Sequence, residues 1–120
     1  MRRLLTGLVY VALLGCGSNP TAAPPQGTVY FRMDAVSCVY TVSKSVTFYI
    51  AGVEMGTESL ASGATSTAYL TKLSANYAKR GNPVVRARIA GYTATGGALW
   101  TLPANIEVTA DVPVTHLVVC

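Results

Sequence analysis

The chain has 120 residues, enough for one domain with a single modest core. Apolar residues make up 51% of it and charged residues only 12%, and Thr, Val, Tyr, Gly and Ser are frequent, a composition that favours strands and turns over amphipathic helices. The formal net charge is +4, from nine basic and five acidic residues, and no run of Lys or Arg tracks a phosphate backbone. We therefore expect an all-β domain and no nucleic-acid partner.

The N-terminal segment has the parts of an export signal. Two arginines precede an apolar run over residues 4–14, which is too short to span a bilayer because a membrane helix needs about 20 residues. The motif Leu-Leu-Gly-Cys at 13–16 resembles the lipobox of bacterial lipoproteins. The resemblance implies a signal peptide over 1–15, cleavage before Cys16 and attachment of lipid to the thiol of that cysteine.

Lipid on Cys16 implies an anchor in the membrane, and several acyl chains make such an anchor effectively permanent. In the lipoprotein family an Asp after the cysteine often marks retention at the inner membrane, so Gly17 implies the outer membrane of a two-membrane bacterium. Cleavage also removes two arginines and leaves seven basic and five acidic residues, a net charge of +2. Residues 16–26 contain three prolines and no apolar period, which predicts a lipidated, extended tether before a folded domain over 27–120.

Three cysteines are an odd number for an exported protein. Lipidation accounts for Cys16 and leaves Cys38 and Cys120 to form a disulfide in a compartment that permits one. Two buried free thiols are the alternative. We expect no metal and no cofactor, because His116 is the only histidine and the sequence has no Cys-x-x-Cys motif.

The first half of the domain alternates in polarity. The pattern after residue 27 predicts a strand that buries Val29, Phe31 and Met33, and residues 37–42 are a second extended candidate. A strand over 46–50 is then expected to form a tight hairpin through Ala51-Gly52, because glycine readily takes the positive φ that such a turn needs.

The second half continues as short strands. A polar loop or one helical turn is expected over 74–83, a turn at Gly96-Gly97 before the only tryptophan, and a bend or sheet edge at Pro113. The inward residues are expected to be Val85, Ala87, Ile89, Ile106, Val108, Ala110 and Val112. The strands themselves are expected over 66–73, 84–90, 98–102, 105–112 and 114–120.

About seven short strands, with turn signals every eight to fifteen residues, predict a small antiparallel β-sandwich, with a small open barrel as the alternative. Residues 46–56, 84–88 and 106–119 together resemble the small immunoglobulin-like or transthyretin-like sandwiches of bacterial envelope proteins, including PEGA-type domains. The resemblance implies a fold class only, because such sandwiches host many unrelated functions.

We expect a membrane-anchored envelope lipoprotein whose sandwich has a non-catalytic structural or binding role toward an envelope protein or polysaccharide. A set of outward tyrosines and arginines is the candidate binding face, able to stack on sugars or to pair with anionic groups if its strands share one sheet. Otherwise these side chains only cover the wet side of a sheet. The set comprises Tyr30, Arg32, Tyr49, Arg86 and Arg88.

The alternative is a small envelope enzyme, or an enzyme subunit, that uses His116 or a carboxylate; a pocket holding His116 within hydrogen-bond reach of a carboxylate would favour it. Against it, we expect His116 to point outward from the last strand. We also expect solvated roles for the carboxylates, which are Asp34, Glu54, Glu58, Glu107 and Asp111. A carrier with a barrel interior is a third option, for which about 94 residues leave little room.

Overall fold

The computed structural model describes residues 24–74 and 79–120. The predicted signal peptide over 1–15, the lipid site at Cys16 and most of the predicted tether lie outside the described residues. The described part is all-β. Its ten strands are β1 (Gln26–Met33), β2 (Lys44–Ile50), β3 (Val53–Leu60), β4 (Tyr69–Lys72), β5 (Arg80–Gly81), β6 (Val84–Ile89), β7 (Leu99–Trp100), β8 (Ala104–Asn105), β9 (Val108–Thr109) and β10 (Val114–Val118).

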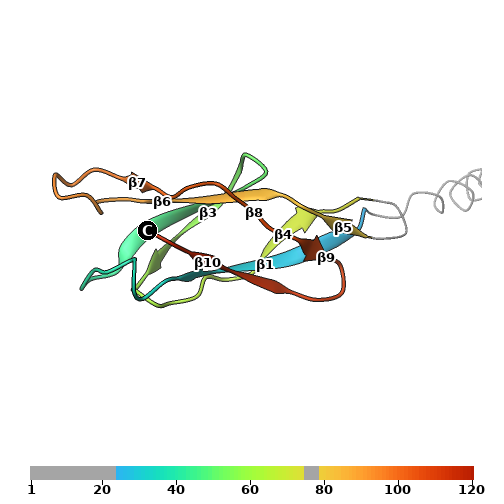
Figure 1. Ribbon diagram of the computed structural model, residues 1–120, viewed down its shortest axis with the longest axis horizontal. Coiled ribbons are helices and arrows are strands. Elements are labelled where there is room, and N and C mark those ends of the chain that lie inside the picture. Colours follow the sequence, from blue (N-terminus) through green and yellow to red (C-terminus); the bar gives the residue numbers. More distant parts are fainter. Residues whose placement is uncertain (1–23, 75–78) are drawn as a thin grey trace, which may run out of the picture.

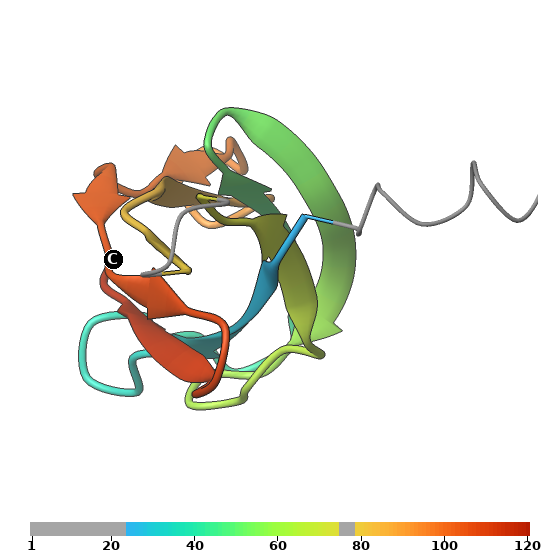
Figure 2. The same ribbon diagram turned by 90° about the vertical axis from the view of Figure 1, so that its right-hand side faces the viewer.

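Two sheets form a small β-sandwich, the predicted fold class (Figure 1). We call them sheet A, in the order β10-β1-β4, and sheet B, in the order β3-β2-β6-β7 with β8 also on β6; β5 and β9 form a short extra pair. All pairs are antiparallel except β1 with β10, which run parallel. Viewed end on, the sheets curl toward each other around the core (Figure 2).

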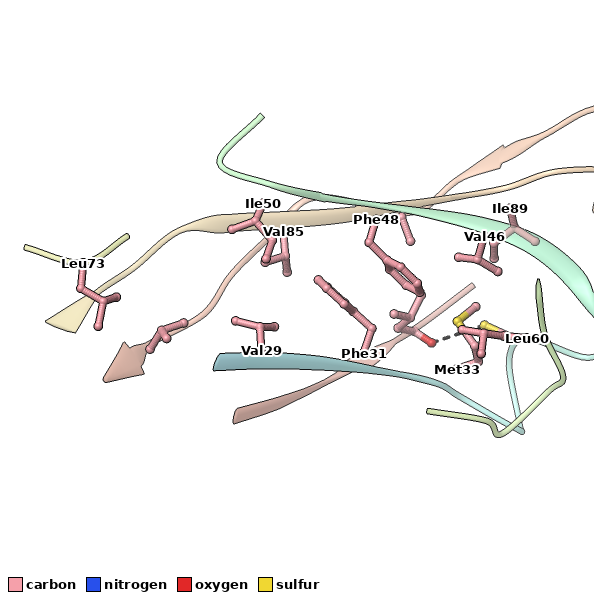
Figure 3. Close-up of a cluster of buried hydrophobic side chains, with 14 residues drawn as sticks. Val29, Phe31, Met33, Val46, Phe48, Ile50, Leu60, Leu73, Val85 and Ile89 are labelled. Atoms are coloured by element: carbon pink, nitrogen blue, oxygen red, sulfur yellow. Dashed lines mark hydrogen bonds between the residues drawn. The ribbon is translucent and has the colours of Figure 1, made fainter. Parts of the chain in front are cut away.

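The core lies between β1 of sheet A and β2 and β6 of sheet B (Figure 3). At its centre the rings of Phe31 and Phe48 stack across the two sheets, with their centroids 4.4 Å apart and their planes 14° from parallel. Alternate residues of the three strands point inward, as predicted, because strand side chains alternate between faces. The buried residues of these strands are Val29, Phe31, Met33, Val46, Phe48, Ile50, Val85, Ala87 and Ile89.

The predicted hairpin joins β2 to β3. Ala51 and Gly52 both have positive φ, 53° and 79°, the combination that a two-residue turn needs to match the twist of the flanking strands. The amide of Ala51 donates to the carbonyl of Val84 at 2.8 Å, so the turn is also tied to β6. This places the tip of the hairpin beside the start of β6.

One predicted strand does not form, and the strands predicted over 66–73, 98–102 and 105–112 are shorter or interrupted. Residues 37–42 form a loop, because Asp34 and the backbone around Cys38 turn the chain there: the Cys38 amide donates to the Asp34 carbonyl at 2.8 Å. Residues 105–112 break into pieces of two residues each, and the chain bends at 110–112 before Pro113. The bend leaves Val112 64% exposed and not inward as predicted, whereas Val108 is buried.

Cys38 and Cys120 form a disulfide across 82 residues of chain. It joins the loop after β1 to the end of the chain after β10. The Cys120 amide donates to the Ser37 hydroxyl at 3.0 Å, and that hydroxyl donates to the Asp34 carboxylate at 2.8 Å. The hydrogen bond from the Ser37 hydroxyl, with a further one from the Val36 amide, lowers the pKa of Asp34 because these bonds stabilise its ionised form. The disulfide therefore lies in a corner of the fold, between the loop after β1 and the end of the chain, that these hydrogen bonds hold together.

Candidate functional site

The five residues of the predicted binding face do not share one surface. Tyr30 and Arg32 alternate with the buried residues of β1 and so lie on the outer face of sheet A. Tyr49, Arg86 and Arg88 lie on the outer face of sheet B, where Tyr49 pairs with Arg86 across β2 and β6. The structure thus divides the set between opposite sides of the sandwich.

On sheet B the three residues gather around Trp100, and we call these four the Trp100 cluster. The Cζ atom of Arg86 lies 4.7 Å from the centroid of the indole, and that of Arg88 lies 5.9 Å from it. The ring of Tyr49 lies 5.2 Å from the indole at an interplanar angle of 39°. Two cations and two aromatic rings therefore meet on one face, within the distance at which a cation is attracted to a ring.

Hydrogen bonds fix part of this arrangement. The Nε of Arg86 donates to the carbonyl of Thr101 at 2.8 Å. The buried hydroxyl of Thr101 accepts from the amide of Ala87 at 2.9 Å and donates to the carbonyl of Ala87 at 3.2 Å. The segment that carries Trp100 is thereby fastened to β6, and the Arg86 side chain is oriented through its Nε.

The two arginines of the cluster form no ion pair with a carboxylate of the described residues. The ion pair found among residues 24–74 and 79–120 joins Arg80 to Glu107, 3.2 Å apart, and both of its side chains are exposed. Neither Arg86 nor Arg88 has such a partner in these residues. The carboxylate that the strand register places beside the cluster is Glu54, which pairs with Tyr49 across β2 and β3.

A hollow of about 370 Å³ lies beside the cluster. The tip of the β2–β3 hairpin and the chain after β7 form its rim. Its lining combines aromatic, apolar and cationic side chains, as in small-molecule sites, where a few polar groups orient a ligand on an apolar floor. The lining residues are Tyr49, Gly52, Val84, Arg86, Trp100 and Pro103.

No protein-family model, curated protein or solved structure matches this chain. In the two described ranges, no helix is long and apolar enough to cross a membrane. Those ranges also hold no group of three or more His, Cys, Asp or Glu side chains that could bind a metal ion.

Sequence reasoning placed Trp100 in a strand but not in the binding face. The signal that could have found it is the turn at Gly96, where φ is +86°. This turn folds β7 back along β6 and pairs Trp100 with Arg88, and paired residues show their side chains on the same face of a sheet. The turn predicts that β7 returns along β6 but does not give the register, because the paired residues Arg88 and Trp100 lie eight and four residues from Gly96.

His116 does not point outward, and that prediction is wrong. Because β10 runs parallel to β1, His116 pairs with the buried Phe31, and their rings lie 6.1 Å apart in an edge-on contact. Burial lowers the pKa of His116 below its ordinary value, because desolvation disfavours the charged imidazolium.

His116 also lines a second hollow, of about 390 Å³, between β10 and the chain after β7. The other residues of this lining come from 99–104 and from the end of the chain, and they include no Asp or Glu side chain. The lining therefore lacks the carboxylate that would orient a catalytic histidine.

Three of the five carboxylates have partners in the described residues while remaining accessible to solvent, and Glu107 is the one that pairs with Arg80. Asp34 belongs to the corner at the disulfide. Glu58 of β3 accepts hydrogen bonds from the Tyr69 hydroxyl and from both the amide and the hydroxyl of Thr67, at 3.1 Å and 2.8 Å. Since Tyr69 belongs to β4, these bonds join the neighbouring edges of sheets A and B.

We expect Tyr69→Phe to lower the free energy of unfolding by about 1 kcal/mol at neutral pH, because it removes one hydrogen bond to a carboxylate. Burial, and then the hydrogen bond to Glu58, raises the pKa of Tyr69 to about 12 from the ordinary 10. A raised folded-state pKa gives stability that is full below pH 10 and is lost as the pH rises toward 12. The difference between the two proteins in urea unfolding should therefore shrink over that range. A difference that stays constant from pH 8 to 12 would contradict this role of Tyr69.

Proposed function

We propose that this chain is a lipid-anchored protein of the bacterial outer membrane, and that its sandwich is a non-catalytic binding module that uses the Trp100 cluster. The observation that carries the binding role is the pair of guanidinium groups, Arg86 and Arg88, beside one half-exposed indole with no carboxylate partner in the described residues. Arginines that only keep a surface soluble do not have to gather around one aromatic ring.

Other features support the anchor and the compartment. The motif at 13–16 resembles a lipobox, and the disulfide of Cys38 and Cys120 suits an oxidising location outside the cytoplasm. Figure 1 also shows β7 toward the end of the domain that is remote from the first residues of β1. A tether that ends at β1 would therefore hold the Trp100 cluster away from the lipid surface.

Cys16→Ser tests the anchor. In a two-membrane bacterium we expect the wild-type chain to incorporate labelled palmitate and to sediment with outer membranes, and the variant to lose both the label and the sedimentation. Val39→Ala is the control, because it changes one exposed side chain and leaves both the proposed lipid site and the disulfide intact. Palmitate retained by Cys16→Ser would refute the anchor.

The binding role is tested by capture of the polysaccharide fraction of envelope extract on the immobilised full chain. We expect Arg86→Ser with Arg88→Ser to abolish retention. Arg32→Ser, on the outer face of the other sheet, should retain the material as the wild type does. Equal retention by all three proteins would remove the Trp100 cluster from the proposal.

The alternative function, an enzyme that uses His116, draws on the hollow beside that residue. If His116 is catalytic, any activity of the chain on an envelope substrate must be lost when the imidazole is removed. The lining of the hollow, which has no Asp or Glu side chain, favours the binding module.

A further inference from the structure

We infer that the hollow beside the Trp100 cluster binds a sugar ring that carries a carboxylate, that is, a uronic acid unit of an acidic polysaccharide. This inference rests on the proposed function, because it names the ligand class of the same surface. Three properties of the hollow lead to it: its aromatic walls, its oriented guanidinium group and its size.

The aromatic walls select a ligand with an apolar face. Trp100 is 43% exposed, and the Tyr49 ring stands beside it at 39°, so both rings offer surface to the hollow. The face of an aromatic ring is electron-rich, and the C–H groups on one side of a pyranose ring are weakly positive. A sugar can therefore pack on these walls, whereas a bare phosphate or a lipid headgroup makes no use of them.

The guanidinium groups select a negative charge. Hydrogen bonding of Nε to Thr101 orients Arg86, and its terminal nitrogens have no hydrogen-bond partner among the described residues. Such a planar group binds a carboxylate through two parallel hydrogen bonds, and Arg88 supplies a second positive charge nearby. A neutral sugar would leave both charges unpaired.

Size limits the ligand to a few rings. A volume of about 370 Å³ is near the lower end of the range for small-molecule sites, about 300–1,000 Å³. A single-stranded nucleic acid also combines flat rings with anionic groups, but proteins that bind it use a groove of positive charges along the strand. The cluster offers two cations and no such track, so an acidic sugar fits it better.

The test uses the intrinsic fluorescence of Trp100, the only tryptophan of the chain. Trp100 lines both this hollow and the hollow beside His116, but Arg86 lines only the former, so a response at the proposed site must depend on Arg86. The full chain in detergent micelles is titrated separately with trigalacturonate, maltotriose, inorganic phosphate and oligothymidylate. We expect a saturable change with trigalacturonate only. Arg86→Ser and Arg86→Lys should each weaken that binding about tenfold or more, the lysine because it cannot form the paired hydrogen bonds. Arg32→Ser should bind as the wild type does.

Each other outcome overturns the inference. An equal response to maltotriose would make this a neutral-sugar site, and a response only to phosphate or oligothymidylate would make it an anion or nucleic-acid site. If none of the four probes changes the fluorescence but capture of envelope polysaccharide still depends on Arg86 and Arg88, the uronate inference fails and the proposed function stands. If capture is also unaffected by those substitutions, both fail.

Discussion

Replacing Cys38 and Cys120 together by Ser is expected to lower the free energy of unfolding by about 4.5 kcal/mol. The disulfide closes a loop between residues 82 apart, and in the loop-entropy model a cross-link of that span removes about this much conformational freedom from the unfolded chain. Because small domains are stable by only about 5–15 kcal/mol, the variant should be close to unfolding at 37 °C.

The position of the disulfide adds to this effect. It holds the last residue of the chain against the loop after β1, where the Tyr92 hydroxyl also donates to the Ser37 carbonyl at 3.0 Å. The edge strand β10 pairs only with β1 in sheet A. Without the cross-link, the end of β10 should therefore fray before the rest of the sandwich unfolds, and hydrogen exchange should be fastest there.

Urea unfolding with and without a thiol reductant measures the effect. The wild-type chain should lose about 4.5 kcal/mol on reduction, and the double Ser variant should be indifferent to the reductant. Cys16→Ser should behave as the wild type, because it leaves the pair intact. Wild-type stability in the double variant would show that the cross-link adds nothing to the fold.

Alternation of polarity was sufficient to predict the central strands and their buried faces. β1, β2 and β6 each bury one face against the core and expose the other. Apolar and polar residues therefore alternate along them, and this alternation indicates a half-buried strand. The hairpin at Ala51-Gly52 was also predictable, because Gly52 readily takes the positive φ of such a turn, although nothing in the sequence signals the positive φ of Ala51. These features depend on residues close together in the sequence.

Alternation does not say which sheet a strand joins. β1 and β2 have the same pattern, but they face each other across the core, so Tyr30 and Tyr49 point to opposite sides of the molecule. The candidate face could therefore not be assembled from the sequence. The same limit explains His116, whose inward orientation follows from the parallel pairing of β10 with β1, a contact between the two ends of the domain.

Local hydrogen bonds account for the strand that did not form. Residues 37–42 have an extended, apolar-rich pattern, but the Asp34 carboxylate accepts hydrogen bonds from the Val36 amide at 3.2 Å and from the Ser37 hydroxyl at 2.8 Å and so folds the chain into a turn. Val39 is consequently 67% exposed. An Asp that follows a strand and precedes a Ser by three residues is a turn signal that competes with alternation.

Phe48→Ala is expected to lower the free energy of unfolding by about 3–5 kcal/mol. Phe48 is fully buried, and its ring stacks on Phe31 at 4.4 Å and lies 5.7 Å from the ring of Tyr69. Its loss would leave a cavity between sheets A and B, because a well-packed core relaxes only partly into such a gap. It would also remove the contact energy of the aromatic pair, about 0.5–1.5 kcal/mol beyond area burial.

Denaturant unfolding of a graded set of variants checks this expectation. Phe48→Leu keeps part of the volume and should cost clearly less than Phe48→Ala, so it remains measurable even where the alanine variant does not fold. Val39→Ala, which removes an apolar side chain from the exposed loop, should change stability by no more than about 0.5 kcal/mol. If Phe48→Ala cost as little as Val39→Ala, then Phe48 would lie outside the core, and the facing of sheets A and B through Phe31 and Phe48 would be incorrect. The loss of stability should therefore be largest for Phe48→Ala, smaller for Phe48→Leu and smallest for Val39→Ala. This order tests whether Phe48 lies between the two sheets.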